Sequence, residues 1–359
     1  MTRTPTVYDV AHAAGVSTAT VSYTFRNPSR VKESTRELVL DVAQRLGYVP
    51  NASARNLARG RTGVLGLFAY DFLWDAPDRR IPAGGVLPES HELTGEPYDE
   101  FRLFPVYLDE VQRGFELECW RRGFEIIISG RQGAVEDSAI SELAGRVDGL
   151  AVFPRRVARP TLQHIARRIP VVELASRGDT DTCSRIDIDN ADGVAQLIEH
   201  LHGKHGHRTF RFVAADDNAD SDTRHLAFAA EITRLGLVAL PALRQSPKLA
   251  EELAALQGTG ALPDALVCAS DQVALETLDI LHRLGIRVPG DVAITGFDGI
   301  LAGATSQPRI TTVRQPMSEI GRLAADLLIA RSADAEIPNE TIVLAIRLLV
   351  RESCGCTPA

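Results

Sequence analysis

The sequence predicts an all-α helix-turn-helix head followed by an α/β core of two doubly wound parallel-sheet subdomains. Three observations predict this division. Residues 1–62 carry a net charge of +5, whereas the whole chain of 359 residues carries −8. Apolar residues in the head recur at helical spacing, and beyond Thr62 short β-branched runs alternate with amphipathic segments. A basic head on an acidic body indicates phosphate binding by the head, although charge alone leaves a solvated basic face open.

Residues 6–24 are expected to form two short helices around a tight turn. Thr6 and Asp9 have the spacing of a capping box, Gly15 ends the first helix, and Ser17 is a favourable N-cap for the second. The apolar stripe of the first helix comprises Val7, Val10, Ala11 and Ala14.

A third helix is expected to begin at Ser34, with a capping box to Glu37, and to stop at Gly47. Its inward-facing residues are expected to be Leu38, Val42 and Leu46. Three helices so spaced predict a helix-turn-helix unit, whose second helix enters the DNA major groove. Such three-helix shapes also occur without DNA, so the spacing by itself leaves a plain bundle open.

The motifs of the head occur in one order without a gap: Val7–Ala11, Ala14–Ser17 and Leu46–Asn51, with Arg55 and Leu57 following. This pattern resembles the N-terminus of the LacI/GalR transcriptional repressors. The resemblance implies a DNA-binding domain over 1–49 and a hinge helix over 50–60 that folds only on operator DNA. Leu57 falls on the family's intercalating leucine, and packing on the next domain is its alternative role.

The residues expected to contact DNA lie in the second helix, in the turn after it and in the hinge. Thr18, Ala19 and Tyr23 are expected to read bases, and Tyr23 departs from the Arg or His that relatives often carry. The full predicted set is Thr6, Ser17, Thr18, Ala19, Thr20, Ser22, Tyr23, Asn27, Arg30, Asn51, Ala54, Arg55, Leu57 and Ala58.

The core, residues 61–359, is expected to hold two parallel sheets with helices on both faces. A ligand would bind between them, near the carboxyl ends of the strands. Strands are expected over 63–69, 125–129, 149–153, 171–174, 209–214, 265–269 and 292–295, and helices over 107–122, 191–202, 221–235 and 272–284. The first subdomain is expected to span 61–188 and 316–344, and the second 189–315 and 345–359.

The core motifs Ala269–Ala274, Leu284–Asp298 and Thr311–Pro316 resemble the effector-binding core of the same family, which is itself similar to periplasmic sugar-binding proteins. The resemblance implies that Arg224 and Asp298 line the pocket. A guanidinium donates hydrogen bonds and a carboxylate accepts them. The hydroxyl groups of a polyol do both, so this pair of residues suits a polyol ligand. A salt bridge between the subdomains is the alternative. The predicted effector-binding residues are Phe153, Arg224, Ser270 and Asp298, and Phe153 is equally explained by packing.

Two departures from the family leave the ligand less certain. A segment over 71–103, rich in Pro and Gly, is inserted after the first strand; it suits a lid or binding loop, or a disordered loop. Trp74, Tyr98 and Phe101 within it are candidate pocket or interface aromatics. Ser176 stands where the family commonly has an aspartate.

No metal, cofactor or catalytic site is expected. The histidine run His200–His207 looks like a metal cluster, but it coincides with a helix end and no acidic or thiol ligand stands at a fitting spacing in the sequence. Cys354 and Cys356 lie in a polar tail, and the five cysteines are interpreted as packed or incidental thiols. The chain lacks a Gly-x-Ser-x-Gly elbow, a Walker loop and a Gly-x-Gly-x-x-Gly turn, so no enzyme is expected.

The sequence therefore predicts a repressor that binds a pseudo-palindromic double-stranded operator as a homodimer and responds to a small-molecule effector, a sugar. The sign of the response is left open, and the eight residues after Arg351 are too few for a tetramerisation helix. A nucleoside-responsive regulator, or a sugar-binding protein with a vestigial head, are the alternatives. Without a signal peptide or a long apolar run, a cytoplasmic protein without membrane contact is expected.

Overall fold

The computed structural model describes residues 5–49, 61–69, 106–129, 137–153, 157–175, 182–215 and 219–357. The chain divides into two compact units, Met1–Thr62 and Gly63–Ala359. The predictions made for the hinge, 50–60, and for the insertion, 71–103, lie outside the described residues. Among the helices described, none is both long and apolar enough to cross a membrane.

The head contains the helices that the sequence predicts. The Thr6 hydroxyl accepts a hydrogen bond from the Asp9 amide while the Asp9 carboxylate accepts one from the Thr6 amide, so the predicted capping box is confirmed. Gly15 ends the first helix in the left-handed region, at φ 64°, and the Ser17 hydroxyl caps the second. The helical elements are α1 (Val7–Ala14), α2 (Thr18–Arg26), η1 (Pro28–Arg30) and α3 (Glu33–Leu46).

The start and inward face of the third helix differ from the prediction. α3 begins at Glu33 after Lys32, which provides no side-chain cap, so the capping box at Ser34 is wrong. Leu38 and Leu46 are 44% and 39% exposed, and their predicted burial is wrong. The buried face consists of Val39, Val42 and Ala43. Because α1 and α2 are short and pack through small side chains, they cover only this narrow stripe of α3.

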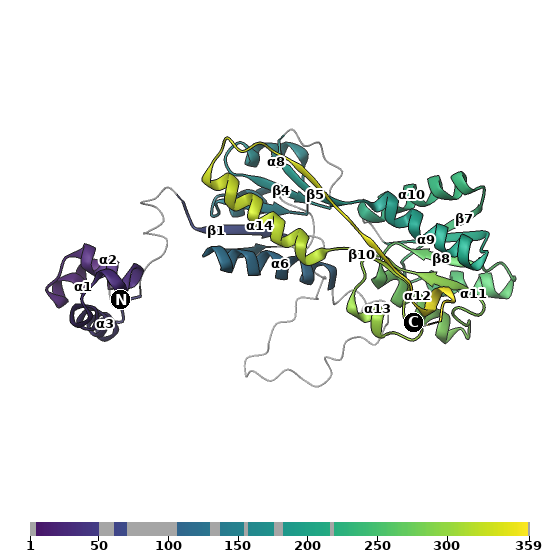
Figure 1. The fold of residues 1–359 in the computed structure, drawn as a ribbon, viewed down its shortest axis with the longest axis horizontal. Helices are drawn as coiled ribbons and strands as arrows, with labels where there is room; N and C mark the ends of the chain where they lie inside the picture. The colour runs from purple at the N-terminus through teal and green to yellow at the C-terminus, as the bar shows by residue number, and fades with distance from the viewer. Residues whose placement is uncertain are drawn as a thin grey trace. The chain divides into compact units, whose positions relative to one another are not determined.

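The core contains two all-parallel sheets, as the predicted fold class requires (Figure 1). Within the described residues, the first sheet has the order β11-β5-β4-β3-β1-β2 and the second the order β7-β6-β8-β9. A short antiparallel pair, β10 with β12, completes the second subdomain. The strands are β1 (Val64–Phe68), β2 (Glu125–Ser129), β3 (Gly149–Val152), β4 (Val171–Leu174), β5 (Ser184–Ile188), β6 (Thr209–Ala214), β7 (Val238–Arg244), β8 (Ala265–Cys268), β9 (Ala293–Thr295), β10 (Thr312–Arg314), β11 (Thr341–Leu344) and β12 (Arg347–Leu349).

The predicted strands correspond to β1–β4, β6, β8 and β9, and two of the strands that the sequence analysis missed, β5 and β7, were missed for different reasons. β5 alternates buried and half-buried residues, and its Arg185 and Asp187 interrupt the apolar run. The edge strand β7 is mostly exposed and carries Pro241. Strands at edges need little apolar surface, so an apolar run does not mark them.

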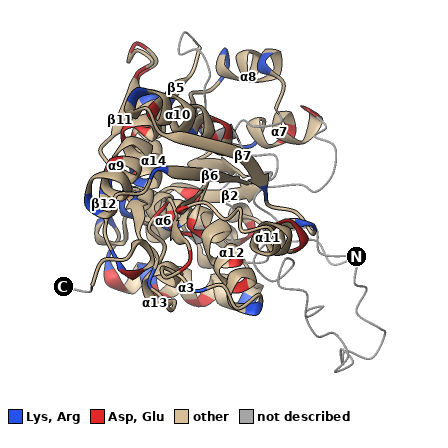
Figure 2. Ribbon diagram, turned by 90° about the vertical axis from the view of Figure 1, so that its right-hand side faces the viewer, with Lys and Arg blue, Asp and Glu red and all other residues tan. Residues whose placement is uncertain are grey.

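Helices cover both faces of the first sheet. Leu65 and Leu67 of β1 belong to the apolar cluster that contains residues of α6 and α14, whereas Phe68 belongs to the cluster with residues of α7 and α8. Alternate side chains of a strand point to opposite faces, so the two helix pairs lie on opposite sides. In Figure 2 the acidic and basic residues gather on the helices, while β7 is mostly tan. The helices are α6 (Val106–Arg122), α7 (Asp137–Ala144), α8 (Arg159–Ala166), α9 (Asn190–His205), α10 (Ala219–Leu235), α11 (Leu249–Gly258), α12 (Asp271–Arg283), α13 (Leu301–Thr305), α14 (Met317–Ala333) and η3 (Glu352–Cys354).

Two glycines let α6 and α14 pack backbone against backbone, side by side in Figure 1. A Cβ on Gly114 would lie 1.8 Å from the Ser318 carbonyl oxygen, and one on Gly321 would lie 1.9 Å from the Val111 carbonyl oxygen. Any larger residue would force the helices apart.

The chain crosses between the two subdomains at three places in the described residues: from β5 to α9, from β10 to α14, and from β11 to β12. Figure 1 shows the yellow C-terminal segment running from one subdomain to the other. Arg314 of β10 also donates two hydrogen bonds to Glu110 of α6, the shorter at 2.7 Å. The core is therefore two lobes joined by several short connections and a forked ion pair.

Candidate functional site

The second helix of the head presents small and polar side chains outward. Ser17, Thr18 and Ala19 are exposed, and Tyr23 is 38% exposed, one helical turn further on. The buried Val21 fixes the opposite face in the head's core. An exposed N-terminal turn with small side chains is what an approach to base edges requires.

A shallow hollow beside α2 is lined partly by polar residues and partly by basic ones. Ser17, Thr20 and Tyr23 border it from α2, and Arg30 and Lys32 border it from the following turn. The Arg30 guanidinium lies 6.0 Å from the centre of the Tyr23 ring. Cations next to a recognition surface are suited to phosphate contacts.

The head residues predicted to contact DNA differ in their exposure and in whether they cap a helix. Thr6 and Ser17 are helix caps, and Ser22 is half-buried. Asn27, the C-cap of α2, and Arg30 are exposed. The hinge residues predicted to contact DNA lie outside the described residues, namely Asn51, Ala54, Arg55, Leu57 and Ala58.

In the core, the polar cluster around Arg224 lies at the carboxyl ends of the strands of the second sheet. Arg224 projects from α10 and is only 4% exposed. It donates to the Asn190 side-chain oxygen at 2.8 Å, to the Ala269 carbonyl at 2.6 Å and to Asp298 Oδ1 at 3.3 Å. Its guanidinium also lies 3.8 Å from the centre of the Phe297 ring. Arg224 and Asp298 belong to the same subdomain, so their ion pair is not the inter-subdomain bridge considered from the sequence.

Asp298 is held in a strained conformation. Its φ of 111° lies in a region that residues with a Cβ rarely adopt. Two backbone hydrogen bonds fix it there: its amide donates to the Val313 carbonyl, and its carbonyl accepts from the Gln315 amide. The Gln315 side chain donates to Asp298 Oδ1 at 2.6 Å. Strain of this kind, which costs about 1–3 kcal/mol, concentrates at ligand sites, and here it aims a carboxylate.

The first subdomain brings an aromatic and an acidic group to the same place. A narrow crevice with an empty volume of about 180 Å³ is lined by Tyr107, Asp187 and Ile188 of the first subdomain and by Asp220 and Gln315 of the second. Burial raises the pKa of Tyr107 well above its usual value, and the nearby Asp220 and Asp298 raise it further. Tyr107 is therefore a neutral hydroxyl at the junction of the two lobes.

Two buried aspartates of the second subdomain, Asp298 and Asp271, have raised pKa values. Burial raises the pKa of Asp298 to about 6, although Arg224 acts in the opposite direction. Burial and the neighbouring Asp298 raise the pKa of Asp271 to about 8. Asp271 accepts hydrogen bonds from the Ile300 amide and the Thr312 hydroxyl, so its role is to hold the loop that carries Asp298.

The two other predicted pocket residues have structural roles in this conformation. The Ser270 hydroxyl caps α12 by accepting from the Val273 amide at 3.2 Å. Phe153 is buried and meets the Tyr107 ring edge to face, with 6.3 Å between the ring centres. Ser270 follows β8, next to Ala269, whose carbonyl binds Arg224. Phe153 instead packs behind Tyr107.

Sequence reasoning missed the partners of the two predicted charges. Asn190, Gln315 and Asp220 come from different elements and meet Arg224 or Asp298 only in the fold. Gln315 stands inside the Thr311–Pro316 motif that resembles the family, which was the available signal. Nothing in the sequence marks Tyr107.

The histidine run has neighbours that the sequence analysis did not foresee. Cys354 and Cys356 lie against His200 and His205, and the four ligand atoms are within 4.8 Å of one another. No thiol stands near the histidine run in the sequence, yet the fold brings Cys354 to it from a point 149 positions beyond His205, so sequence spacing was the wrong measure of which ligands are close.

Comparisons with known proteins match both units. The model of bacterial regulatory proteins of the lacI family matches residues 6–51, and that of the periplasmic binding protein-like domain matches residues 198–354. The chain is 28% identical to the HTH-type transcriptional repressor PurR of Erwinia tasmaniensis over 98% of each chain.

Solved structures agree with this match. The lac repressor dimer bound to operator and the anti-inducer ONPF superposes with a TM-score of 0.77 at 22% identity, covering 98% of this chain and 99% of that one. The transcriptional regulator CelR in complex with cellobiose superposes with a TM-score of 0.63 at 26% identity, covering 97% and 99%. Because head and core both match, and because the relatives match over their whole length, the chain belongs to the lacI family of bacterial regulatory proteins and is a transcriptional regulator rather than an enzyme.

Proposed function

We propose that this regulator is a homodimeric repressor of a pseudo-palindromic operator, and that a sugar bound between the core subdomains controls its operator affinity. The observation that carries the effector proposal is the buried Arg224–Asp298 pair at the carboxyl end of the second sheet, close enough to Tyr107 of the first subdomain for both charges to affect its pKa. The proposed effector residues are Arg224, Asp298, Ser270 and Phe153, the last by supporting Tyr107.

The head supports the DNA part of the proposal. Thr18, Ala19 and Tyr23 face outward from α2, and Arg30 lies beside them for phosphate. One helix reads only a half-site, so two copies are needed to read a palindrome. The lac repressor structure is a dimer on its operator, which is the assembly proposed for this chain.

The chemistry of the crevice favours a polyol. The Asp298 carboxylate accepts from hydroxyls, the Arg224 fork donates to them, and the neutral Tyr107 hydroxyl does either. The cellobiose complex of CelR supports a sugar. An effector with a neighbouring pair of hydroxyls would hydrogen-bond to both charged groups, whereas an apolar ligand would offer them no hydrogen-bond partner.

The size of the crevice supports a conformational response. In this conformation the crevice has no room even for a water molecule, whereas typical ligand sites enclose roughly 300–1,000 Å³. A sugar therefore requires the lobes to separate about their three connections, which breaks or relaxes the Arg314–Glu110 ion pair. A ligand that binds the separated form better shifts the equilibrium between the closed and separated forms toward the separated one. Operator affinity then changes if the two forms place the heads of a dimer differently.

A nucleoside is the second candidate effector. The Tyr107 ring borders the crevice, backed edge to face by Phe153, and an aromatic wall suits a base as well as a sugar ring. The ribose hydroxyls of a nucleoside would still use Arg224 and Asp298.

The first test is a thermal-shift screen of the full chain against sugars, sugar phosphates and nucleosides, because a ligand that binds only the folded state raises the melting temperature. A sugar hit that Asp298→Asn abolishes supports the effector site. Asp291→Asn, at an exposed carboxylate paired with Arg287, is the matched control and should keep the hit. A hit that survives Asp298→Asn would place the effector elsewhere.

The second test measures DNA binding by fluorescence anisotropy on an operator selected from random duplexes. Affinity that falls steeply with salt, and that the effector changes, supports the repressor. Absence of DNA binding at low salt would leave a sugar-binding protein with a vestigial head.

A further inference from the structure

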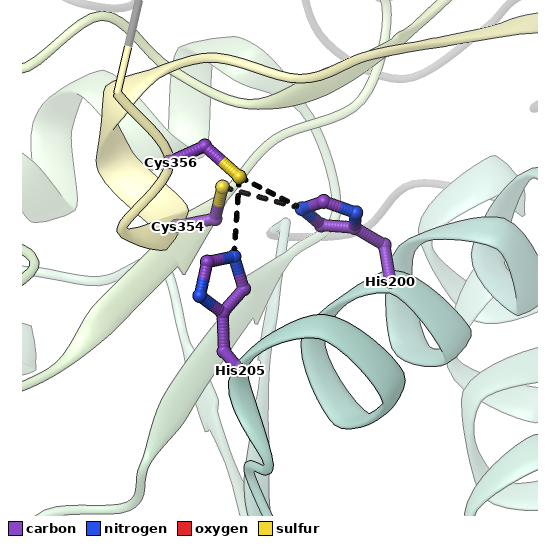
Figure 3. Close-up of side chains that lie close together, drawn as sticks. All are labelled: His200, His205, Cys354 and Cys356. Atoms are coloured by element: carbon purple, nitrogen blue, oxygen red, sulfur yellow. Dashed lines mark hydrogen bonds between the residues drawn. The ribbon is translucent and has the colours of Figure 1, made fainter.

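Four metal-binding side chains converge where the C-terminal segment passes the end of α9 (Figure 3). His200 and His205 project from the last turns of α9, and Cys354 and Cys356 come from η3 and the residues after it. His200 Nε2 lies 3.4 Å from the Cys354 sulfur and 3.6 Å from the Cys356 sulfur. His205 Nε2 lies 3.3 Å from the Cys356 sulfur.

These distances are those of a tetrahedral site. Zinc–nitrogen bonds of about 2.0–2.1 Å and zinc–sulfur bonds of about 2.3 Å set neighbouring nitrogen and sulfur ligands about 3.5 Å apart. The three nitrogen–sulfur contacts, at 3.3 to 3.6 Å, fall around that value. Both histidines present the same ring nitrogen, Nε2, toward the sulfurs.

The C-terminal segment is held in place by contacts that involve none of the four side chains. The Ser353 hydroxyl donates to the Ile294 carbonyl at 2.6 Å and accepts from the Thr311 amide at 2.8 Å. Arg309 forms an ion pair with Glu352. Tertiary contacts thus preorganise the segment, as a rigid binding site requires.

Gly355 makes the convergence of the two sulfurs possible. Its φ of 103° is a left-handed value that reverses the chain between Cys354 and Cys356. A Cβ at this position would lie 3.4 Å from two atoms of the His205 ring. The space admits a Cβ, but the backbone conformation would strain any residue other than glycine, so the Cys-Gly-Cys sequence fits the geometry.

The electrostatics suit a divalent cation. Two thiolates balance the charge of one divalent ion, so the filled site carries no net charge. The site is partly buried, and a neutral site avoids the cost of burying a charge. The site also adjoins the C-terminal end of α9, whose dipole favours positive charge.

We propose that His200, His205, Cys354 and Cys356 bind one zinc ion in a closed site that fastens the C-terminal segment to the end of α9. All four positions come from the protein, which is the arrangement of structural rather than catalytic zinc. Binding displaces the two thiol protons to solvent and changes no oxidation state. The opposite end of α9 carries Asn190, the partner of Arg224, so the metal stabilises an element that lines the effector site without touching the effector.

Cobalt(II) titration of the reduced, metal-stripped full chain tests the proposal without DNA or effector. We expect one cobalt per chain, visible bands of tetrahedral cobalt, a sulfur-to-cobalt charge-transfer band, and displacement of cobalt by zinc. Calorimetric zinc titration in two buffers of different ionisation enthalpy should show release of about two protons per ion, one from each thiol.

Variants locate the site. Cys356→Ser and His205→Ala should weaken zinc binding by more than about 100-fold, since loss of an outer-shell partner alone costs about 10–100-fold. His282→Ala, at an exposed histidine of α12, is the control and should bind zinc as the parent does. Circular dichroism of the metal-free proteins checks that each variant is folded.

Three results would overturn the proposal. The first is cobalt binding without the sulfur band, and the second is zinc affinity that Cys356→Ser leaves unchanged in a folded protein. The third is a Cys354–Cys356 disulfide that persists under the reducing conditions of the assay, detected by mass as the loss of two hydrogens, which would indicate a redox pair instead.

Discussion

Replacing Arg224 by methionine tests the electrostatic reasoning about the effector site. Methionine keeps most of the length of the side chain and its contact with the Phe297 ring, but it removes every donor. The change removes one donor from each of three buried acceptors: the Asn190 amide oxygen, the Ala269 carbonyl and the Asp298 carboxylate, which keeps the hydrogen bond from Gln315.

The size of the effect follows from burial. The Arg224 side chain is 5% exposed and that of Asp298 is 9% exposed, so solvent does not screen the pair. Breaking a buried ion pair by removing one partner costs about 3–5 kcal/mol. At about 1–3 kcal/mol for each buried acceptor that loses a donor, the sum is about 3–9 kcal/mol, which overlaps this range. At roughly 2 °C per kcal/mol for a domain of this size, the melting temperature should fall by about 6–10 °C.

The loss should depend on pH. Burial raises the pKa of Asp298 from 3.8 to about 6, so the folded state loses stability as pH rises from about 3.8 to about 6, and Arg224 offsets part of that loss. At pH 5 the carboxyl is already mostly protonated and needs the guanidinium less. The destabilisation by Arg224→Met should therefore be larger at pH 8 than at pH 5.

Thermal unfolding followed by circular dichroism at the two pH values measures this difference. Arg283→Met is the matched control, because its pair with Asp279 is about half exposed and worth at most about 1 kcal/mol. A loss below about 1 kcal/mol for Arg224→Met, or an equal loss at both pH values, would refute the argument that the buried pair is ionised and mutually dependent.

Three further predictions concern the effector, the packing of the core and the hinge. Effector affinity should fall about 10-fold for each pH unit below 6, because the Asp298 carboxylate is protonated there. Calorimetry between pH 5 and 8 measures the affinity. A pH profile that stays the same in Asp298→Asn would contradict this prediction. Gly114→Ala should destabilise the core by about 1–3 kcal/mol or more. Gly203→Ala, at a position in α9 with open space around it, should stabilise the core by about 0.5–1 kcal/mol. Denaturant titration measures both changes, and equal effects would count against the close contact between α6 and α14. Leu57→Ala should weaken binding to the selected operator more than to random DNA in fluorescence anisotropy, and equal losses would argue against a wedge in the minor groove.

The head shows how far local signals reach. The capping box of Thr6 and Asp9, the left-handed Gly15 and the Ser17 cap all depend on residues within a few positions of one another, and all are confirmed. The burial of α3 depends on what packs against it, and there Leu38 and Leu46 were predicted wrongly. Local pattern determines where a helix ends better than which side chains its neighbours cover.

In the core, the sequence by itself determined the alternation of strands and helices, and through it the parallel sheets, because buried parallel strands are continuous apolar runs. The family motifs indicated Arg224 and Asp298. Only the tertiary structure decided what these residues meet: Asn190, Gln315 and Tyr107 reach them from separate elements and from both lobes.

The zinc ligands show the same division most clearly. Sequence spacing identifies only those metal ligands that lie on one turn or one loop. By that criterion the histidine run had no thiol ligand beside it. His205 and Cys354 meet because β12 pairs with β10 and carries the end of the chain back to α9. Contacts between residues far apart in the chain are fixed by how the sheets and helices pack, which no local pattern encodes.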